Sequence, residues 1–154
     1  MSILCGMADL QADQKGRLRI PGKFRPYFDS CKTIYARKNP AGCIDIVTDE
    51  YINKVMESFD DVSMAGSSEL SEAFAMFSAG LNELNEDSQG RFLLSPILRQ
   101  FAHLGKEVRF IGVRDRLQLW DKETYVEKYE KDDERYNRSM AAIDSFANSR
   151  KANG

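Results

Sequence analysis

The sequence predicts an α+β protein built from two copies of one strand–turn–strand–helix unit, followed by a C-terminal helix. Three observations lead to this fold class: a short turn motif occurs twice, runs rich in β-branched and aromatic residues follow each occurrence, and each set of runs leads into a helical pattern. The chain has 154 residues, of which 42% are hydrophobic and 30% charged. That length suits two small halves that share one core.

The duplication is visible in the turn motif itself. Residues 13–18 (DQKGRL) align with residues 87–92 (DSQGRF) at an offset of 74 positions. The same offset pairs Leu10 with Leu84, Ile20 with Leu94, Phe24 with Leu98, Arg25 with Arg99 and Tyr51 with Tyr125. A single offset that holds from Leu10 to Tyr51 indicates a tandem duplication.

Each copy is expected to begin with a strand, a tight turn and a second strand. In the first copy these strands fall at residues 10–13 and 18–20. The turn's Asp13 or Asp87 can accept hydrogen bonds from the amides that follow, and Gly16 or Gly90 can adopt the positive φ of a tight reversal. Pro21 ends the outgoing strand, and short helical turns are expected at 23–28 and 97–101.

A second hairpin and a helix complete each unit. The predicted strand pairs are 33–36 with 44–47 and 108–113 with 117–119. In the first copy Thr48 or Asp49 can cap a helix. One face of that helix carries Ile52, Val55, Met56 and Phe59. The first repeat is therefore placed at 1–59 and the second at 81–129.

Two further helices are expected outside the repeats. Residues 60–80 read as a polar linker, 60–67, and an amphipathic helix whose face comprises Leu70, Ala73, Phe74, Phe77 and Leu81. A long charged helix is expected from Lys122 to about Asn148, which makes 130–154 a helical tail. Its apolar seam comprises Tyr129, Tyr136, Met140, Ile143 and Ala147. A seam this short is more typical of packing on the same domain than of a coiled coil.

Charge is strongly segregated along the chain. The net charge is −2, but residues 1–38 hold eight Lys and Arg against three Asp and Glu, residues 39–90 hold one against eleven, and residues 91–154 hold thirteen against ten. Such segregation can build a basic face on an acidic molecule, and the local potential is what a phosphate backbone meets.

Few residues suggest catalysis or a metal. His103 is the single histidine of the sequence and lacks a partnered nucleophile or clustered ligands. Cys5, Cys31 and Cys43 are widely spaced, which is typical of free thiols. The sequence has no glycine-rich nucleotide-binding motif, and residues 132–134 (DDE) read as a solvated helix face. We expect a non-enzymatic protein without cofactor or metal; the absence of a leader or a long apolar run favours a cytoplasmic one.

The cations of the first turn are the strongest functional signal. Lys15, Arg17, Arg19, Lys23 and Arg25 fall within eleven residues around the turn, whereas the second copy has Gln89, Arg91, Leu93, Ile97 and Arg99 at these positions. An Asp that orients an Arg can simply stabilise a turn, and it can also preorganise the Arg for a phosphate or a guanine edge. We expect the first copy to be specialised for contact and the second more for packing.

These blocks resemble the MraZ family of bacterial transcriptional regulators. Residues 13–25 (DQKGRLRIPGKFR) look like the first block of the family, and residues 87–91 through 96–99 look like the second, followed by Ile111-Gly112-Val113 and Leu119-Trp120. The resemblance covers about residues 6–129. Ser95 departs from it, since proline is usual there.

The resemblance implies two AbrB-like swapped-hairpin units within one chain, forming a small β-barrel-like core. It also implies a ring-shaped homo-oligomer that binds short direct repeats of double-stranded DNA at its own operon promoter, usually as a repressor. Such a protein would be associated with the nucleoid. The expected DNA-binding residues are Lys15, Arg17, Arg19, Lys23, Arg25, Arg91 and Arg99, and the turn-organising residues are Asp13, Gly16, Asp87 and Gly90. The alternative is an antitoxin-type protein-binding module that uses the C-terminal helix.

Overall fold

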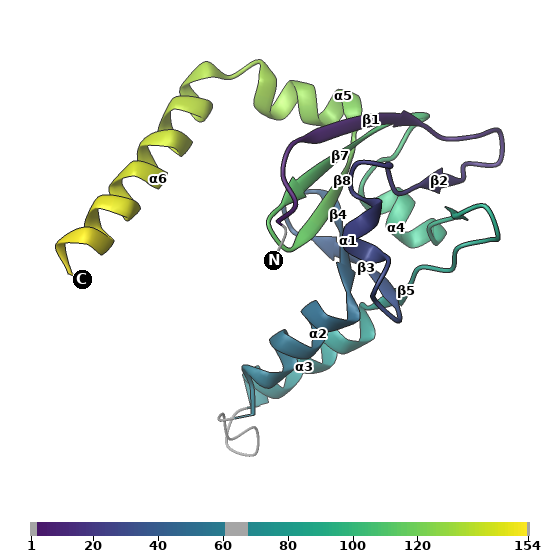
Figure 1. Cartoon of the computed structure of the whole chain (residues 1–154), viewed down its shortest axis with the longest axis horizontal. Coiled ribbons are helices and arrows are strands. Elements are labelled where there is room, and N and C mark those ends of the chain that lie inside the picture. The colour runs from purple at the N-terminus through teal and green to yellow at the C-terminus, as the bar shows by residue number, and fades with distance from the viewer. Residues whose placement is uncertain (1–2, 61–67, 154) are drawn as a thin grey trace. The chain divides into compact units, whose positions relative to one another are not determined.

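The structure is a computed structural model that describes residues 3–60 and 68–153. Most of the predicted linker, residues 61–67, lies outside the described residues. The chain forms two compact units, Met1–Asp121 and Lys122–Gly154. Both copies of the repeat contribute to the first unit (Figure 1). In the described ranges no helix is long and apolar enough to cross a membrane.

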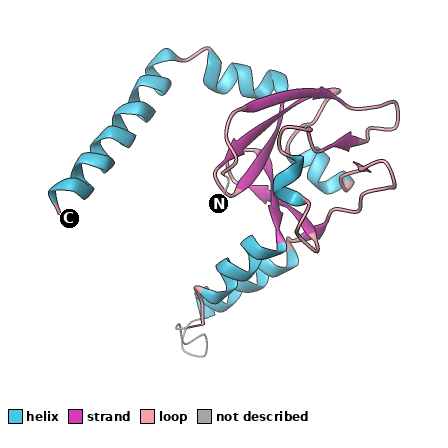
Figure 2. Cartoon of the chain, in the orientation of Figure 1, coloured by secondary structure: helices cyan, strands magenta, loops and turns pink. Residues whose placement is uncertain are grey.

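The first unit is α+β, as predicted, and its described strands pair in antiparallel fashion (Figure 2). Its larger sheet has six strands within the described residues. In order across the sheet they are β1 (Met7–Gln11), β7 (Glu107–Val113), β8 (Arg116–Asp121), β4 (Cys43–Thr48), β3 (Ile34–Asn39) and β5 (Asn82–Glu83). The predicted hairpins β3–β4 and β7–β8 are both present, and each is longer than expected.

The two copies exchange their first strands. β1 of the first copy pairs with β7 of the second, with Asp9 opposite Arg109. β5 of the second copy pairs with β3 of the first, with Glu83 opposite Tyr35, which is the same register after the 74-residue offset. β4 and β8, also equivalent, pair at the centre. The copies are thus related by a pseudo-two-fold axis and neither has a complete sheet alone.

The strands on either side of each turn do not pair with one another as a hairpin. β2 (Leu18–Arg19) instead pairs with its equivalent β6 (Arg91–Phe92) to form a separate two-stranded sheet. The hairpin interpretation of the turn is therefore wrong, although the reversal itself is present. The sequence correctly predicts a strand before and after each turn, but each of these strands pairs with a strand of the other copy.

The core lies between these sheets and draws equally on both copies. It includes equivalent pairs such as Leu18 with Phe92 and Phe24 with Leu98, each at most 5% exposed. Ile44, Phe110 and Leu119 fill the centre of the large sheet with no exposed surface. Burial of the apolar core side chains stabilises the unit.

Helices accompany these strands in both copies. α1 (Arg25–Phe28) and α4 (Pro96–Phe101) are the equivalent short helices after β2 and β6. α2 (Asp49–Glu57) is capped by Thr48, whose Oγ1 accepts a hydrogen bond from the Tyr51 amide at 3.0 Å. α3 (Ser68–Ala79) lies beside α2 in Figure 1, with the rings of Phe59 and Phe74 5.4 Å apart.

The second unit is not the single long helix that we expected. It consists of α5 (Lys122–Tyr125), a π-helical turn η2 (Val126–Glu130) and α6 (Asp133–Ala152). The break is at Asp132, whose carboxylate accepts from the Arg135 amide at 2.9 Å and caps a new helix. The acidic run at 132–134, interpreted from the sequence as a helix face, is thus a helix start, where carboxylates interact favourably with the helix dipole.

Candidate functional site

Turn 1 (residues 13–17) and turn 2 (residues 87–91) have the same geometry. In turn 1 Asp13 Oδ1 accepts hydrogen bonds from the amides of Lys15 at 2.9 Å and Arg17 at 2.8 Å. In turn 2 Asp87 Oδ1 accepts from the equivalent amides at 2.8 and 2.9 Å. Gly16 and Gly90 have φ of 82° and 76°, a region that favours glycine. The residues predicted to organise the turns, Asp13, Gly16, Asp87 and Gly90, thus have equivalent positions and contacts in the two copies.

Each aspartate also holds the arginine that ends its turn. Arg17 Nε donates to Asp13 Oδ2 at 2.7 Å, and Arg91 Nε donates to Asp87 Oδ2 at 2.9 Å. The pKa of Asp87 is lowered to about 2, first by the backbone hydrogen bond from Arg91. The pKa of Asp13 is lowered for the same reason, by the Arg17 amide. Because Nε is fixed, the terminal nitrogens of each guanidinium have a defined direction.

The two turns lie side by side. Arg19 pairs with Arg91 in the β2–β6 ladder, and Arg17 Nη1 lies 3.8 Å from Asp87 Oδ2. Arg19 Nη2 donates to Gln89 Oε1 at 3.4 Å, a long contact between the copies. Lys15 is exposed at the tip of turn 1. The structure thus brings the predicted contacts Lys15, Arg17, Arg19 and Arg91 onto one surface.

Lys23 is not part of this group. Its Nζ donates to the carbonyl of Met7 at 3.3 Å and lies 5.1 Å from the centre of the Phe24 ring. Met7 begins β1, whereas turn 1 follows the end of β1. The side chain is therefore directed toward the opposite end of that strand. The spacing of the cations along the sequence does not show this, because the chain turns between β2 and α1.

Arg25 is near the turns but is neutralised. Its Nε contacts Asp29 Oδ1 at 3.2 Å, and its Nη1 donates to Glu86 of the other copy. The hydrogen bond to Glu86 is the main cause that raises the pKa of Arg25 above its ordinary value. Two carboxylates around one guanidinium leave no net positive charge to attract a phosphate.

Arg99, the equivalent of Arg25, has a different environment. Its Nε is shielded from solvent and has no hydrogen-bond partner within the described part of the chain. The side chain lines an open pocket of about 720 Å³ that also includes Pro96, Gln100, His103 and Leu104. His103, predicted to be structural, is exposed at the end of α4 with a φ of 51°. The sequence predicted Arg99 as a contact but did not predict this pocket.

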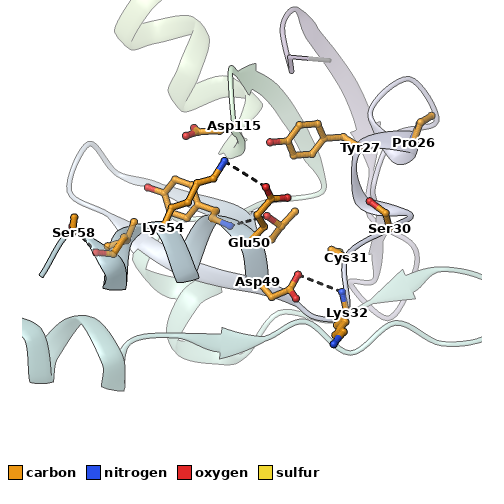
Figure 3. A pocket seen from close by; sticks show the side chains of 13 residues that line it. Pro26, Tyr27, Ser30, Cys31, Lys32, Asp49, Glu50, Lys54, Ser58 and Asp115 are labelled. Carbon is orange, nitrogen blue, oxygen red and sulfur yellow. Dashed lines mark hydrogen bonds and ion pairs between the residues drawn. The ribbon is translucent and has the colours of Figure 1, made fainter. Parts of the chain in front are cut away.

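A second pocket, of about 660 Å³, lies between α1 and the start of α2 (Figure 3). Asp115, one of its lining residues, is in the β7–β8 connection, at the end of β7 far from turn 1. Two of its carboxylates have partners: the Lys32 backbone amide donates to Asp49 Oδ1 at 3.3 Å, and Glu50 lies 3.4 Å from Lys54 Nζ. This pocket is mixed in charge and separate from the turns.

Among residues 3–60 and 68–153 no group of three or more His, Cys, Asp and Glu side chains could hold a metal ion. Within the described residues Cys5, Cys31 and Cys43 are not in disulfide bonds, and they are exposed, half-buried and buried respectively. Burial is the main cause that raises the pKa of Cys31.

The structure thus combines a duplicated α+β fold with two equivalent Asp–Arg turns. Residues 76–147 match the model described as "MraZ protein, putative antitoxin-like". Over these residues the chain is similar to the MraZ family. The match runs from α3 through the second repeat into α6, and the first repeat, with turn 1, lies before it.

Proposed function

We propose that this chain is a non-enzymatic, sequence-specific DNA-binding regulator, acting as a repressor at the promoter of its own operon. The observation that carries the proposal is turn 1, where Asp13 holds Arg17 by its Nε beside the exposed Lys15 and Arg19. An arginine fixed in this way can present its terminal nitrogens to a guanine edge or a phosphate without first losing rotamer freedom. Surrounding lysine and arginine side chains would supply phosphate contacts.

The exchanged strands support an AbrB-like swapped-hairpin arrangement. β1 and β5 each pair with a strand of the other copy in the six-stranded sheet. β2 and β6 pair with each other in the separate two-stranded sheet. We infer a small barrel-like core that holds both turns on one edge. This placement supports a DNA-binding role, because a rigid scaffold keeps the two turns at a fixed separation.

A ring-shaped homo-oligomer that binds short direct repeats is part of the same proposal. One turn makes few contacts, so a single chain would bind weakly. Several chains in one assembly would raise the effective concentration of each further turn at neighbouring repeats. A protein of this kind would act in the cytoplasm, associated with the nucleoid.

Fluorescence anisotropy with double-stranded DNA from upstream of the protein's own gene, beside a scrambled duplex, tests the proposal across a salt series. We expect tighter binding to the native duplex, weakened by salt. Arg17→Ala should cost about 1–3 kcal/mol of binding free energy and reduce the preference for the native sequence. Arg91→Ala is the matched variant in turn 2 and should cost less. No sequence preference at any salt concentration would contradict the proposal.

One observation favours a second candidate, an antitoxin-type module that covers a protein partner. The family description includes antitoxin-like, and α6 exposes Tyr136 at 62%, Ile143 at 61% and Phe146 at 67%. Large apolar side chains gathered on one helix are typical of a protein-binding surface. Deletion of residues 130–154 separates the candidates: DNA binding should survive the deletion, whereas binding of a protein partner should be lost.

A further inference from the structure

Arg25 and Arg99 occupy equivalent positions of the two copies, yet only one of them is neutralised. Arg25 has Asp29 and Glu86 as ion-pair partners. Across the described ranges, Arg99 has no ion pair, and its Nε has no hydrogen-bond partner. A guanidinium that is half-buried without a counter-charge is unusual, because burial weakens its hydration.

The sequence explains this difference at two positions. At the 74-residue offset, the equivalent of Glu86 is Ala12, and the equivalent of Asp29 is His103. Both arginines lie in the short helices that follow equivalent strands, Arg25 in α1 and Arg99 in α4. Both carboxylates that would neutralise Arg99 have therefore been replaced by residues that carry no negative charge.

The charged groups that differ between the copies lie next to the glycines of the two turns. A Cβ added to Gly16 in turn 1 would lie 3.7 Å from Arg99 Nη1. A Cβ added to Gly90 in turn 2 would lie 3.7 Å from the carboxylate oxygen Oε2 of Glu86. Arg99, a cation of the second copy that has no counter-charge among the described residues, therefore lies next to the glycine of turn 1. Glu86, an anion, lies next to the glycine of turn 2.

We propose that Arg99 and Lys15 form a phosphate-binding site on turn 1, and that Glu86 and Asp29 close the equivalent site on turn 2. The site is built from both copies: Lys15 and Gly16 belong to the first, and Arg99 belongs to α4 of the second. The pocket beside Arg99 leaves room for a phosphate to approach. That phosphate would supply the missing counter-charge, and the terminal nitrogens of an arginine can bind it in bidentate fashion.

The inference rests on the proposed function for the source of the phosphate, a DNA backbone, but the site can be tested with inorganic phosphate alone. In an amide and Arg Nε–H NMR titration of the full chain, phosphate should shift the signals of Gly16 and Arg99. The signal of Gly90 should move much less, because Glu86 repels the anion there.

Two substitutions exchange the properties of the turns without removing any cation. Ala12→Glu introduces a carboxylate at the equivalent of Glu86, and Ala12→Gln is its matched neutral control. Glu86→Gln removes the carboxylate beside turn 2. We expect Ala12→Glu to weaken phosphate binding at turn 1 about tenfold or more relative to Ala12→Gln, through charge alone. We expect Glu86→Gln to add a phosphate-dependent shift at Gly90.

A non-specific duplex provides the second readout. Each phosphate contact contributes about 0.9 to the slope of log K against log salt concentration. Ala12→Glu should therefore lower that slope by about one relative to Ala12→Gln. If Ala12→Glu prevents folding, Glu86→Gln still tests the proposal, because it leaves turn 1 unchanged and its readout is the response of Gly90 to phosphate.

The outcomes distinguish this site from the proposed function. Equal responses of Gly16 and Gly90 to phosphate, or unchanged phosphate binding in Ala12→Glu, would overturn the site even if DNA binding remained. Phosphate binding at Gly16 in a protein that binds no duplex would support the site and remove DNA as its source.

Discussion

Gly112→Ala should destabilise the protein by displacing its N-terminal segment. A Cβ at position 112 would lie 2.5 Å from the nitrogen and 2.8 Å from the Cα of Cys5. These are backbone atoms, so no side-chain rotation can relieve the overlap. Either the segment at residues 4–6 or strand β7 must move.

The contacts of that segment give the magnitude. Leu4 is 4% exposed, and burial of a leucine contributes about 1.5–3 kcal/mol. Leu4 and Arg114 exchange two backbone hydrogen bonds, at 2.9 and 2.8 Å, and the Gly112 amide donates to the Gly6 carbonyl at 2.8 Å. Each contributes about 1 kcal/mol net. Partial loss of these contacts should lower the free energy of unfolding by about 2–5 kcal/mol.

Urea denaturation followed by tryptophan fluorescence measures the effect, since Trp120 is 1% exposed in the folded protein. Gly22→Ala is the matched control, because a Cβ there meets nothing within 4 Å. The control should change the free energy of unfolding by less than about 0.5 kcal/mol. Equal stability of the two variants would refute the reasoning, because it would mean that the space between β7 and the N-terminal segment can hold a methyl group.

Two further predictions concern pH and the core. The pKa of Asp87 is about 2 in the folded protein, below its ordinary value of 3.8. The ionised Asp87 therefore stabilises the fold above pH 3.8, and this stabilisation is lost as the pH falls from 3.8 toward 2. The urea midpoint should therefore fall less steeply with acid in Asp87→Asn than in the wild type, and parallel profiles would contradict this. The side chain of Leu119 has 0% exposure, so Leu119→Ala should lower the free energy of unfolding by about 3–5 kcal/mol in the same urea assay. Leu93 is 52% exposed, and Leu93→Ala should lower it by less than about 1 kcal/mol. Similar losses of stability in the two variants would argue against the central position of Leu119.

Local features of this fold were predictable from the sequence because their causes are local. Asp13 and Asp87 accept hydrogen bonds from amides two and four residues later, so the motif itself specifies the turn. The helix cap at Thr48 and the apolar face of α2 follow from neighbouring positions in the same way. The 74-residue offset then carried each assignment from one copy to the other.

Strand partners and ion pairs between the copies were not predictable in this way. Asp9 finds Arg109 at a sequence separation of 100, with Nε 2.7 Å from the carboxylate. Arg25 finds Glu86 at a separation of 61. A run of β-branched and aromatic residues indicates that a strand forms, but not which neighbouring strand it pairs with. The local sequence therefore did not predict that β1 and β5 are exchanged between the copies. For the same reason Arg25 could be counted as a cation without its neutralising partner.

The pairing of both turns within one polypeptide has a genetic consequence. In a symmetric homodimer a single codon specifies the residue at both turns, so every change appears twice. Here Lys15 and Gln89, or Ala12 and Glu86, are encoded separately although the strands still interlock as two halves. Fusion of the copies therefore allows mutation to alter one half of the surface while the other half keeps the shared core intact.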